Sequence, residues 1–365
     1  MIRLTALMFT AALLASPLAA ESEVPETPSD GSYNTELGLP YGAPGRGEID
    51  HEALRRRSLE VLERQFGAFD SAAAGLAEVA AAHCTGEVSE DALKAQFAAT
   101  WLAWAPLDSY QFGPIQNIGA ALTVNFWPDK KNFVGRGLRA LLELPPEQQA
   151  DPSVVAGASA AAQGLPALET LLYTDLPPCP AVVGISGYMA GLSNALYQLW
   201  FGPDGWADLA RTTGPDNPVY LSAEEFTKTL YTAVDFGLVR IEEARLGRPL
   251  GTYERSFPTR AEAWRSGLTN PIIHAQLRGL EDLIALGFAG DVREPDRAWI
   301  LQVFEQAHDR LDAIGVDIST AVEDPATRFR VESLQDKIAY LRSELAQTIG
   351  PELGVDTGFS AADGD

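Results

Sequence analysis

The chain has 365 residues, of which 46% are hydrophobic, and it carries a formal net charge of −23 at pH 7. This length is enough for one large domain or two ordinary ones, with a sizeable buried core. The strong acidity argues against nucleic acid or an anionic lipid surface as a partner, because both require clustered Lys and Arg side chains. The acidity is consistent with a protein that binds cations, and it is also consistent with a charge that serves only to keep the protein soluble.

The first 20 residues have the features of an export signal. Arg3 supplies the positive charge, residues 4–14 supply a short apolar run, and small residues up to Ala20 predict cleavage near that position. Glu21 follows too soon for a membrane anchor, and no cysteine follows the apolar run as a lipoprotein signal requires. No later segment has the roughly 18 uninterrupted apolar residues of a spanning helix. We therefore expect a periplasmic protein that has no transmembrane segment. We also expect that it is not a lipoprotein.

Residues 21–46 are rich in Pro, Gly, Ser and Glu, which predicts a flexible tether. The helical pattern begins at Asp50, a suitable N-cap, and continues to about His83. A second helix is expected to begin after Ser89 and to stop near Pro106. Residues 106–130 contain several Gly and Pro residues and are predicted to be mostly loop.

Helical character returns over residues 132–143 and again over residues 152–173, where Asp151 is a plausible N-cap. Pro166 lies inside the second pattern, so a kink is expected because proline cannot donate to the carbonyl of Ala162. Glu169 follows one turn later among leucines. The freed carbonyl and the carboxylate suggest a cation or hydrogen-bonding site. The alternative is a kinked core helix with Glu169 at its rim.

A long helix is expected after Pro180, and residues 213–221, with two prolines and a glycine, mark the best domain boundary. Four more helices are predicted at about 222–246, 271–288, 294–314 and 325–349. Alternating β-branched runs between turn signals are missing. The predicted fold is therefore all-α, with an N-terminal helical bundle over 47–215 and a C-terminal helical bundle over 216–365.

The two cysteines, Cys84 and Cys179, are expected to form a disulfide, since an exported protein meets an oxidising environment. A Cys-x-x-Cys motif is absent, which argues against a redox role or a zinc ribbon.

Metal-binding motifs are sparse in this sequence, which has four histidines and no His-Glu-x-x-His motif. Glu305, His308 and Asp312 share one side of a predicted helix, at the Glu-x-x-His spacing of di-iron bundles. Such bundles use two of these motifs, and only one is found. The alternative is a solvated histidine at the edge of an apolar stripe.

Several segments together resemble the imelysin family over residues 47–365. The segment from Gly164 to Leu172 matches the position of the family's Gly-x-His-x-x-Glu motif, and residues 358–365 are similar to its Gly-Phe-Asn-x-x-Asp-Gly-Asp tail. Further similar segments are Trp101 with Trp104, 112–114, 127–129 and 246–251.

The resemblance implies two helical bundles facing each other across a cleft that contains the motif residues. It also implies a periplasmic or outer-membrane location and an association with iron uptake, and some members carry a metallopeptidase label. Pro166 stands where the motif has its histidine, so only Gly164 and Glu169 carry over. A histidine–glutamate metal pair therefore cannot form from this motif.

Three functions remain open from the sequence. The first is an envelope protein of iron uptake that binds a metal or a metal-bearing ligand in the cleft, with iron or another divalent cation held by Glu169. The second is a binding or interaction module for a non-metal ligand, and the third is a metallopeptidase, which the missing histidine argues against. The partner is expected to be a small ligand or an envelope component of iron uptake, and no enzymatic activity is expected. The candidate ligand-binding residues are Gly164, Pro166, Glu169, Gln116, Asp129, Arg136 and Asp363.

Overall fold

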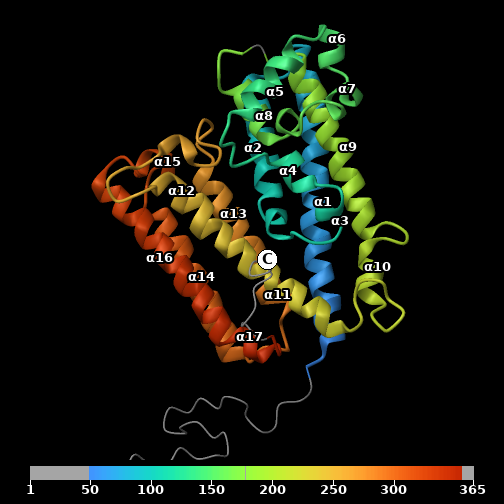
Figure 1. The fold of residues 1–365 in the computed structure, drawn as a ribbon, viewed down its shortest axis with the longest axis vertical. Helices are drawn as coiled ribbons and strands as arrows, with labels where there is room; N and C mark the ends of the chain where they lie inside the picture. Colours follow the sequence, from blue (N-terminus) through green and yellow to red (C-terminus); the bar gives the residue numbers. More distant parts are fainter. Residues whose placement is uncertain (1–48, 177, 356–365) are drawn as a thin grey trace, which may run out of the picture. The chain divides into compact units, whose positions relative to one another are not determined.

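The computed structural model describes residues 49–176 and 178–355, and Figure 1 shows their arrangement. The predicted signal peptide over 1–20, the predicted tether over 21–46 and the candidate residue Asp363 lie outside the described residues. The expectations for these segments therefore stay predictions.

The described residues form helices joined by turns and loops, and β-pairing among them is limited to isolated bridges at Thr252–Arg255 and Ala289–Val292. The predicted all-α class is confirmed. The longer helices are α1 (His51–Cys84), α2 (Glu90–Trp104), α5 (Phe133–Leu142), α8 (Leu165–Leu172), α9 (Ala181–Phe201), α11 (Ala223–Val239), α13 (Thr269–Asp282), α14 (Glu294–Asp312) and α16 (Pro325–Gln347). Short helices are α3 (Pro114–Asn117), α4 (Ala120–Val124), α6 (Pro146–Gln149), α7 (Pro152–Ala156), α10 (Trp206–Arg211), α12 (Gly247–Leu250), α15 (Ile318–Ala321) and α17 (Ile349–Glu352). Single turns are η2 (Leu107–Ser109), η3 (Ala160–Ala162) and η5 (Pro258–Arg260).

Polar side chains cap the helices where the sequence predicts their starts. The Asp50 carboxylate accepts a hydrogen bond from the backbone of Ala53 at the start of α1. The Ser89 hydroxyl accepts one from Ala92 at the start of α2. Such caps satisfy backbone N–H groups that have no partner within the helix.

The four predicted helices of the second half are all present, and two of them end in wide π-helical turns. Helix α11 continues into η4 (Arg240–Leu246), and α13 continues into η6 (Leu283–Gly287). π-Helical turns are rare in proteins as a whole, but those that occur are often found at functional sites. Here η4 carries two arginines, Arg240 and Arg245, whose roles are described below.

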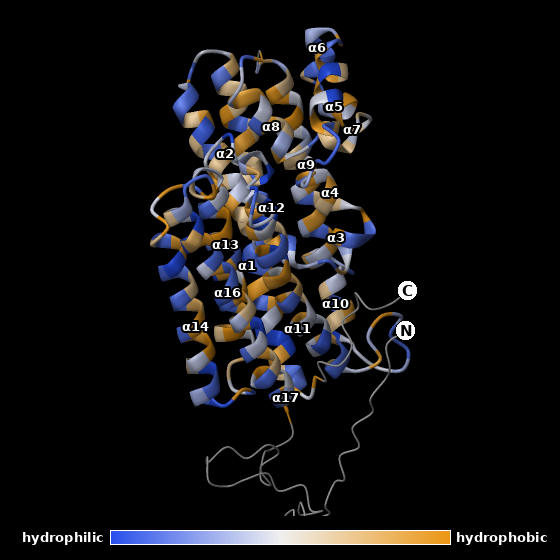
Figure 2. Cartoon of the chain, turned by 60° about the vertical axis from the view of Figure 1, so that its left-hand side comes forward, coloured by the Kyte–Doolittle hydropathy of each residue, from blue (hydrophilic) through white to orange (hydrophobic). Residues whose placement is uncertain are grey.

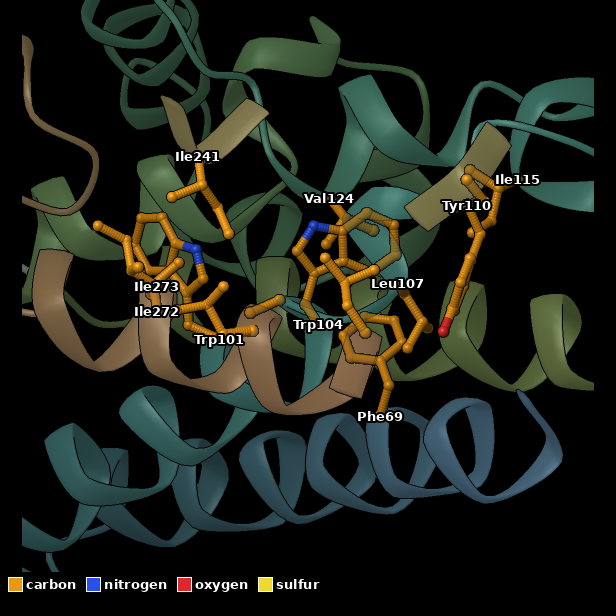
Figure 3. Close-up of a cluster of buried hydrophobic side chains, with 14 of the residues drawn as sticks. Phe69, Trp101, Trp104, Leu107, Tyr110, Ile115, Val124, Ile241, Ile272 and Ile273 are labelled. Carbon is orange, nitrogen blue, oxygen red and sulfur yellow. The ribbon is translucent and has the colours of Figure 1, made fainter. Parts of the chain in front are cut away.

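Helix α1 packs along α9 and α2 and also contacts α11 and η6, while α14 packs on α16 (Figure 1). Blue and orange residues are mixed along most helices in Figure 2, as expected for amphipathic helices that bury one stripe. Phe69 of α1, Trp101 and Trp104 of α2 and Ile272 of α13 meet in the core (Figure 3). One buried apolar cluster thus contains residues from both sides of the predicted boundary at 215/216, and that boundary stays a prediction.

The single helix expected over residues 152–173 is wrong. The chain forms α7, η3 and α8 in succession, and the Gln163 amide replaces helical hydrogen bonding by donating to the carbonyls of Val155, Ala156 and Ala158 at 2.9–3.0 Å. Pro166 lies in the first turn of α8, where a missing N–H costs nothing. The expected kink is therefore absent. The Ala162 carbonyl, which the kink was expected to free, belongs to η3 and not to α8.

The expected disulfide between Cys84 and Cys179 is present, with their Cα atoms 5.9 Å apart. Cys84 is the last residue of α1, and Cys179 lies just before α9. The bond therefore ties together the ends of two helices that pack along each other. Within the described part of the chain, no helix has the length and apolarity needed to cross a membrane.

Candidate functional site

A pocket of about 190 Å³ lies around Glu169, and both sequence halves contribute to it. Below, it is called the Glu169 pocket. Its walls come from the loop before α5, the start of α8, and the segment from α12 to the start of α13. The lining residues are Trp101, Phe126, Trp127, Pro128, Asp129, Asn132, Val134, Gly135, Pro166, Glu169, Thr170, Arg248, Thr259, Arg260, Ala261, Ala263, Trp264 and Arg265.

Glu169 connects α8 to the facing segment. One carboxylate oxygen, Oε1, accepts hydrogen bonds from the backbone N–H groups of Arg265 and Ser266, at 3.0 and 2.9 Å, and from the Ser266 hydroxyl at 2.8 Å. The other, Oε2, lies 3.7 Å from the Arg265 guanidinium. The carboxylate is thus already supplied with donors by the protein itself.

Burial dominates the electrostatics of Glu169, whose residue surface is only 2% exposed. Burial raises the pKa of its carboxyl group because it penalises the charged form, and the hydrogen bonds from Ser266 and the charge of Arg265 partly oppose this. Glu169 is therefore a buried carboxylate in the pocket wall, and the predicted place at the rim of a kinked helix is wrong.

Asp129, the other carboxylate that lines the pocket, serves as a structural cap. Its Oδ1 accepts from the N–H groups of Lys131 and Phe133 at 3.2 and 2.8 Å, and its Oδ2 accepts from Val134 at 2.9 Å. These bonds hold the start of α5 in place. Both oxygens are occupied, so Asp129 has little remaining capacity to coordinate a cation.

Three arginines line the Glu169 pocket, namely Arg248, Arg260 and Arg265, against two carboxylates. Arg265 lies over the ring of Trp264 and is paired with Glu169. Arg248 lies near the ring of Trp127, at 5.8 Å from the centroid. Burial lowers the pKa of Arg248, and the neighbouring positive charge of Arg260 lowers it further.

A buried polar network supports the pocket from within the core. Arg245, which is fully buried, donates to Glu262 at 2.5 Å and to Asp108 at 2.9 Å, and it also donates to Gln276. Arg240 donates to the same Asp108 carboxylate. The two carboxylates balance the two guanidinium groups, which is the condition for tolerating buried charges.

The network also joins the two pocket walls. Asn125, at the base of the loop that carries Trp127, donates to Glu262 at 2.6 Å. Glu262 lies between the lining residues Ala261 and Ala263. Burial alone would lower the pKa of Arg240, but the charges of Asp108 and Glu262 outweigh it and raise that pKa. The wall positions are therefore held by charge-assisted bonds.

The structure brings only some of the predicted site residues together. Glu169, Pro166 and Asp129 line the same pocket, whereas Gln116 lines a separate cavity near Trp206. Arg136 lies over the Phe133 ring and donates to the Lys131 carbonyl at 2.7 Å, and it is not among the lining residues.

Gly164 has a packing role rather than a lining one. A Cβ atom at this position would lie 2.2 Å from the Thr123 carbonyl oxygen and 2.3 Å from that of Val124. Only glycine therefore allows the start of α8 to pack against α4.

The predicted group of Glu305, His308 and Asp312 is replaced by a histidine pair. The Nδ1 atoms of His308 and His274 are 2.7 Å apart with nearly parallel rings, and His274 Nε2 lies 2.8 Å from Asp312 Oδ1. Glu305 is exposed on the same helix. His308 itself is partly buried beside the buried stripe of α14, as the alternative of a histidine at its edge expects, and the contact with His274 is the feature that the sequence does not predict.

Metal binding would need three or more suitably placed ligands. Across residues 49–176 and 178–355, no group of three His, Cys, Asp or Glu side chains is placed to hold a metal ion. In the Glu169 pocket the two carboxylates are engaged by backbone donors. The lining residues therefore offer donors to a ligand more readily than they offer acceptors.

Four lining residues carry no signal in the sequence that marks them as site residues: Arg248, Arg260, Trp264 and Arg265. Arg248 falls in the segment 246–251, which carries the family resemblance, but its neighbours there give no charge pattern that marks a pocket. The network of Arg245 and Glu262 was missed for the same reason. Spacings of 17 and 137 residues between its members leave no short-range signal.

Solved structures with the same fold support the resemblance noted in the sequence. An imelysin-like protein from Psychrobacter arcticum 273-4 matches with a TM-score of 0.68 and 20% identity, covering 86% of this chain and 99% of that one. A putative iron-regulated protein A precursor from Parabacteroides distasonis ATCC 8503 matches with a TM-score of 0.65 and 12% identity, covering 86% and 100%. At these identities the likeness establishes the fold. No curated protein sequence matches the chain.

A family profile described as imelysin, with the peptidase label M75, matches residues 64–345. This span is most of the chain, and it includes every residue that lines the Glu169 pocket. The chain belongs to the imelysin family.

Proposed function

We propose that this protein is an exported binding protein of the imelysin family and that its ligand occupies the Glu169 pocket. The observation that carries the proposal is the way Glu169 joins α8 to residues 265 and 266 beside a cavity. A concave site with convergent polar groups and a perturbed carboxyl pKa is the usual signature of a binding site. Because the cavity is about 190 Å³, smaller than a typical drug-sized pocket, the ligand is small.

Binding is favoured over catalysis by the chemistry of the lining residues. A peptidase needs a nucleophile or a metal-activated water, together with a general base. The described residues that line the pocket include no histidine, cysteine or serine, and Glu169 already accepts three hydrogen bonds. The peptidase label of the family profile therefore finds no support in this pocket.

A role in iron uptake rests on likeness alone. One structural neighbour is named a putative iron-regulated protein A precursor, and the disulfide fits an exported protein. A metal-bearing ligand suits the pocket better than a bare cation, since the lining carboxylates are engaged and arginines are present.

The test is to isolate the full chain from its native envelope and to identify any bound small molecule by native mass spectrometry. Thr170→Phe should fill the pocket and abolish retention, because Thr170 lines it. Thr174→Phe is the matched control. Both hydroxyls donate to the carbonyl four residues earlier, but Thr174 is exposed outside the lining. Equal retention by all three proteins, or no retained molecule in the wild type, would contradict the proposal.

The peptidase alternative has its own test. Incubation of the purified protein with a peptide library should give no hydrolysis, whether or not zinc or iron is added. Chelator-sensitive cleavage that is lost in Glu169→Gln would instead establish the enzyme and overturn the binding proposal.

A further inference from the structure

Two of the arginines in the Glu169 pocket have no carboxylate partner in the described part of the chain. Asp108 and Glu262 are paired with Arg240 and Arg245 in the core, and Glu169 is paired with Arg265. Arg248 and Arg260 form no ion pair within residues 49–176 and 178–355, and each lies against an aromatic ring. The pocket thus has a local surplus of positive charge in a chain whose net charge is −23.

Arg248 and Arg260 line the same pocket despite their like charge, with Arg248 partly buried and Arg260 exposed. Arg260 acts electrostatically on Arg248, and burial together with this repulsion lowers the pKa of Arg248. Like charges placed together in this way destabilise the folded state until an opposite charge arrives. An anion bound between them would remove that repulsion.

Hydrogen-bond donors without partners are found in the same wall. The Arg248 Nε atom is buried and has no hydrogen-bond partner among the described residues, and the same holds for the indole Nε1 of Trp101. Both residues line the pocket. Buried donors without acceptors cost free energy, so acceptor oxygens that reach these two atoms would be favoured.

We propose that the ligand of the Glu169 pocket is a small oxyanion, carboxylate or phosphate in character, held by Arg248 and Arg260. This inference rests on the proposed function and specifies its ligand class. Guanidinium groups match carboxylate and phosphate oxygens through paired, charge-assisted hydrogen bonds. The arrangement admits an anionic metal chelate, in which the anion and not the metal contacts the protein.

The test is calorimetric titration of the full chain with three probes at low ionic strength: citrate, inorganic phosphate and ferrous ion. Citrate or phosphate should bind to the wild type, and which of them binds more tightly identifies the oxyanion source. Arg260→Gln and Arg248→Gln should each weaken that binding about ten- to a hundredfold, because each removes charge-assisted hydrogen bonds. The affinity of Arg248→Lys should lie between those of the wild type and Arg248→Gln, since lysine keeps the positive charge but lacks the paired N–H donors of a guanidinium group.

Arg139→Gln is the matched control for overall charge, because Arg139 is exposed on α5 and does not line the pocket. It should leave the affinity unchanged. Added salt should weaken binding to the wild type, since the interaction is between charges.

Two outcomes overturn the inference. One is binding of ferrous ion alone with no effect of Arg248→Gln, which would leave the pocket as the binding site but with a cation as ligand. The other is equal anion affinity in wild type, Arg260→Gln and Arg248→Gln. Failure of the proposed function itself is recognised separately, because Thr170→Phe would then leave the binding of every probe unaltered.

Discussion

The Asn125 side chain donates a hydrogen bond of 2.6 Å to Glu262, and this contact joins the two walls of the Glu169 pocket through the protein core. Glu262 also accepts from Arg245 at 2.5 Å. Both Glu262 and Arg245 are fully buried. The position of the lining segment around Trp264 therefore depends on an ion pair that solvent does not reach.

Glu262→Gln should destabilise the fold by about 3 kcal/mol, because removal of one partner leaves the Arg245 charge buried with less compensation. Chemical denaturation measures this change. Glu254→Gln on the exposed part of the same segment is the control and should change the free energy of unfolding by less than about 0.5 kcal/mol. A loss for Glu262→Gln as small as the control would show that the pair contributes little to the free energy of unfolding.

Gly164→Ala should cost about 2 kcal/mol, because the added methyl group would overlap the carbonyl oxygens of Thr123 and Val124 and force a backbone shift. Gly157→Ala is the matched control, since its Cβ would meet its nearest atom at 3.5 Å, an ordinary contact. Thermal unfolding of the two variants should separate them clearly. Equal melting temperatures would contradict the packing role given to Gly164.

Removal of the disulfide in Cys84→Ser with Cys179→Ser should lower the free energy of unfolding by about 4 kcal/mol, because the bond closes a loop spanning a separation of 95 residues. The measurement is chemical denaturation of the variant beside the oxidised wild type. Mass spectrometry of the native protein should find no free thiol. Two free thiols would mean that the bond does not form in the cell.

The helices that carry local signals could be predicted from the sequence, and those that depend on distant contacts could not. The starts of α1 and α2 follow from Asp50 and Ser89, whose capping roles lie within three residues. The break between α7 and α8 was missed because Gln163 satisfies backbone carbonyls that a helix would otherwise use. A side chain that replaces backbone donors in this way does not change the spacing of apolar residues, so the helical pattern in the sequence continues across the break.

The same distinction holds for the site. Glu169 was identified because a family motif and a glutamate among leucines are visible in one short segment. Arg248 and Arg260 cannot be identified in this way. An arginine is recognised as an anion-binding residue only when the structure shows that no carboxylate of the protein is paired with it. Two of the candidate ligand-binding residues, Glu169 and Asp129, line one pocket, but their carboxylate oxygens accept hydrogen bonds from backbone N–H groups.

The pair of His274 and His308 should make stability fall as the solution is acidified. Only one N–H can lie between the two Nδ1 atoms, so the doubly charged pair is disfavoured. Burial lowers the pKa of His274, the charge of His308 and that of Arg278 act in the same direction, and Asp312 opposes them. The folded state then binds fewer protons than the unfolded chain, and stability is lost as pH falls below about 6.5.

His274→Gln should remove this dependence, so that the variant loses less stability than the wild type between pH 7 and 5. His83→Gln is the control, because His83 lies at the end of α1 and bonds to the Val88 carbonyl. Denaturation curves at several pH values provide the comparison. Parallel pH profiles for wild type and His274→Gln would refute the prediction.

Glu169 should give a pH dependence of the opposite sign. Burial raises the pKa of its carboxyl group, so the folded state holds the proton to a higher pH than the unfolded chain does. Its contribution to stability is therefore full below the unfolded pKa of about 4.3 and is lost as pH rises through the folded value. The Glu169→Gln variant has no titratable carboxyl group at this position, so it lacks this pH dependence.

The free energy of unfolding of wild type relative to Glu169→Gln should therefore decrease steadily as pH is raised from 4 to 7. The glutamine still offers one oxygen to the donors of Arg265 and Ser266, which keeps α8 joined to the facing wall. Glu305→Gln, at an exposed position, controls for the loss of one carboxylate. A wild type that gains stability over Glu169→Gln across this range would mean that hydrogen bonds and the charge of Arg265 outweigh burial. The Glu169 carboxylate would then be ionised in the folded state at no cost in stability.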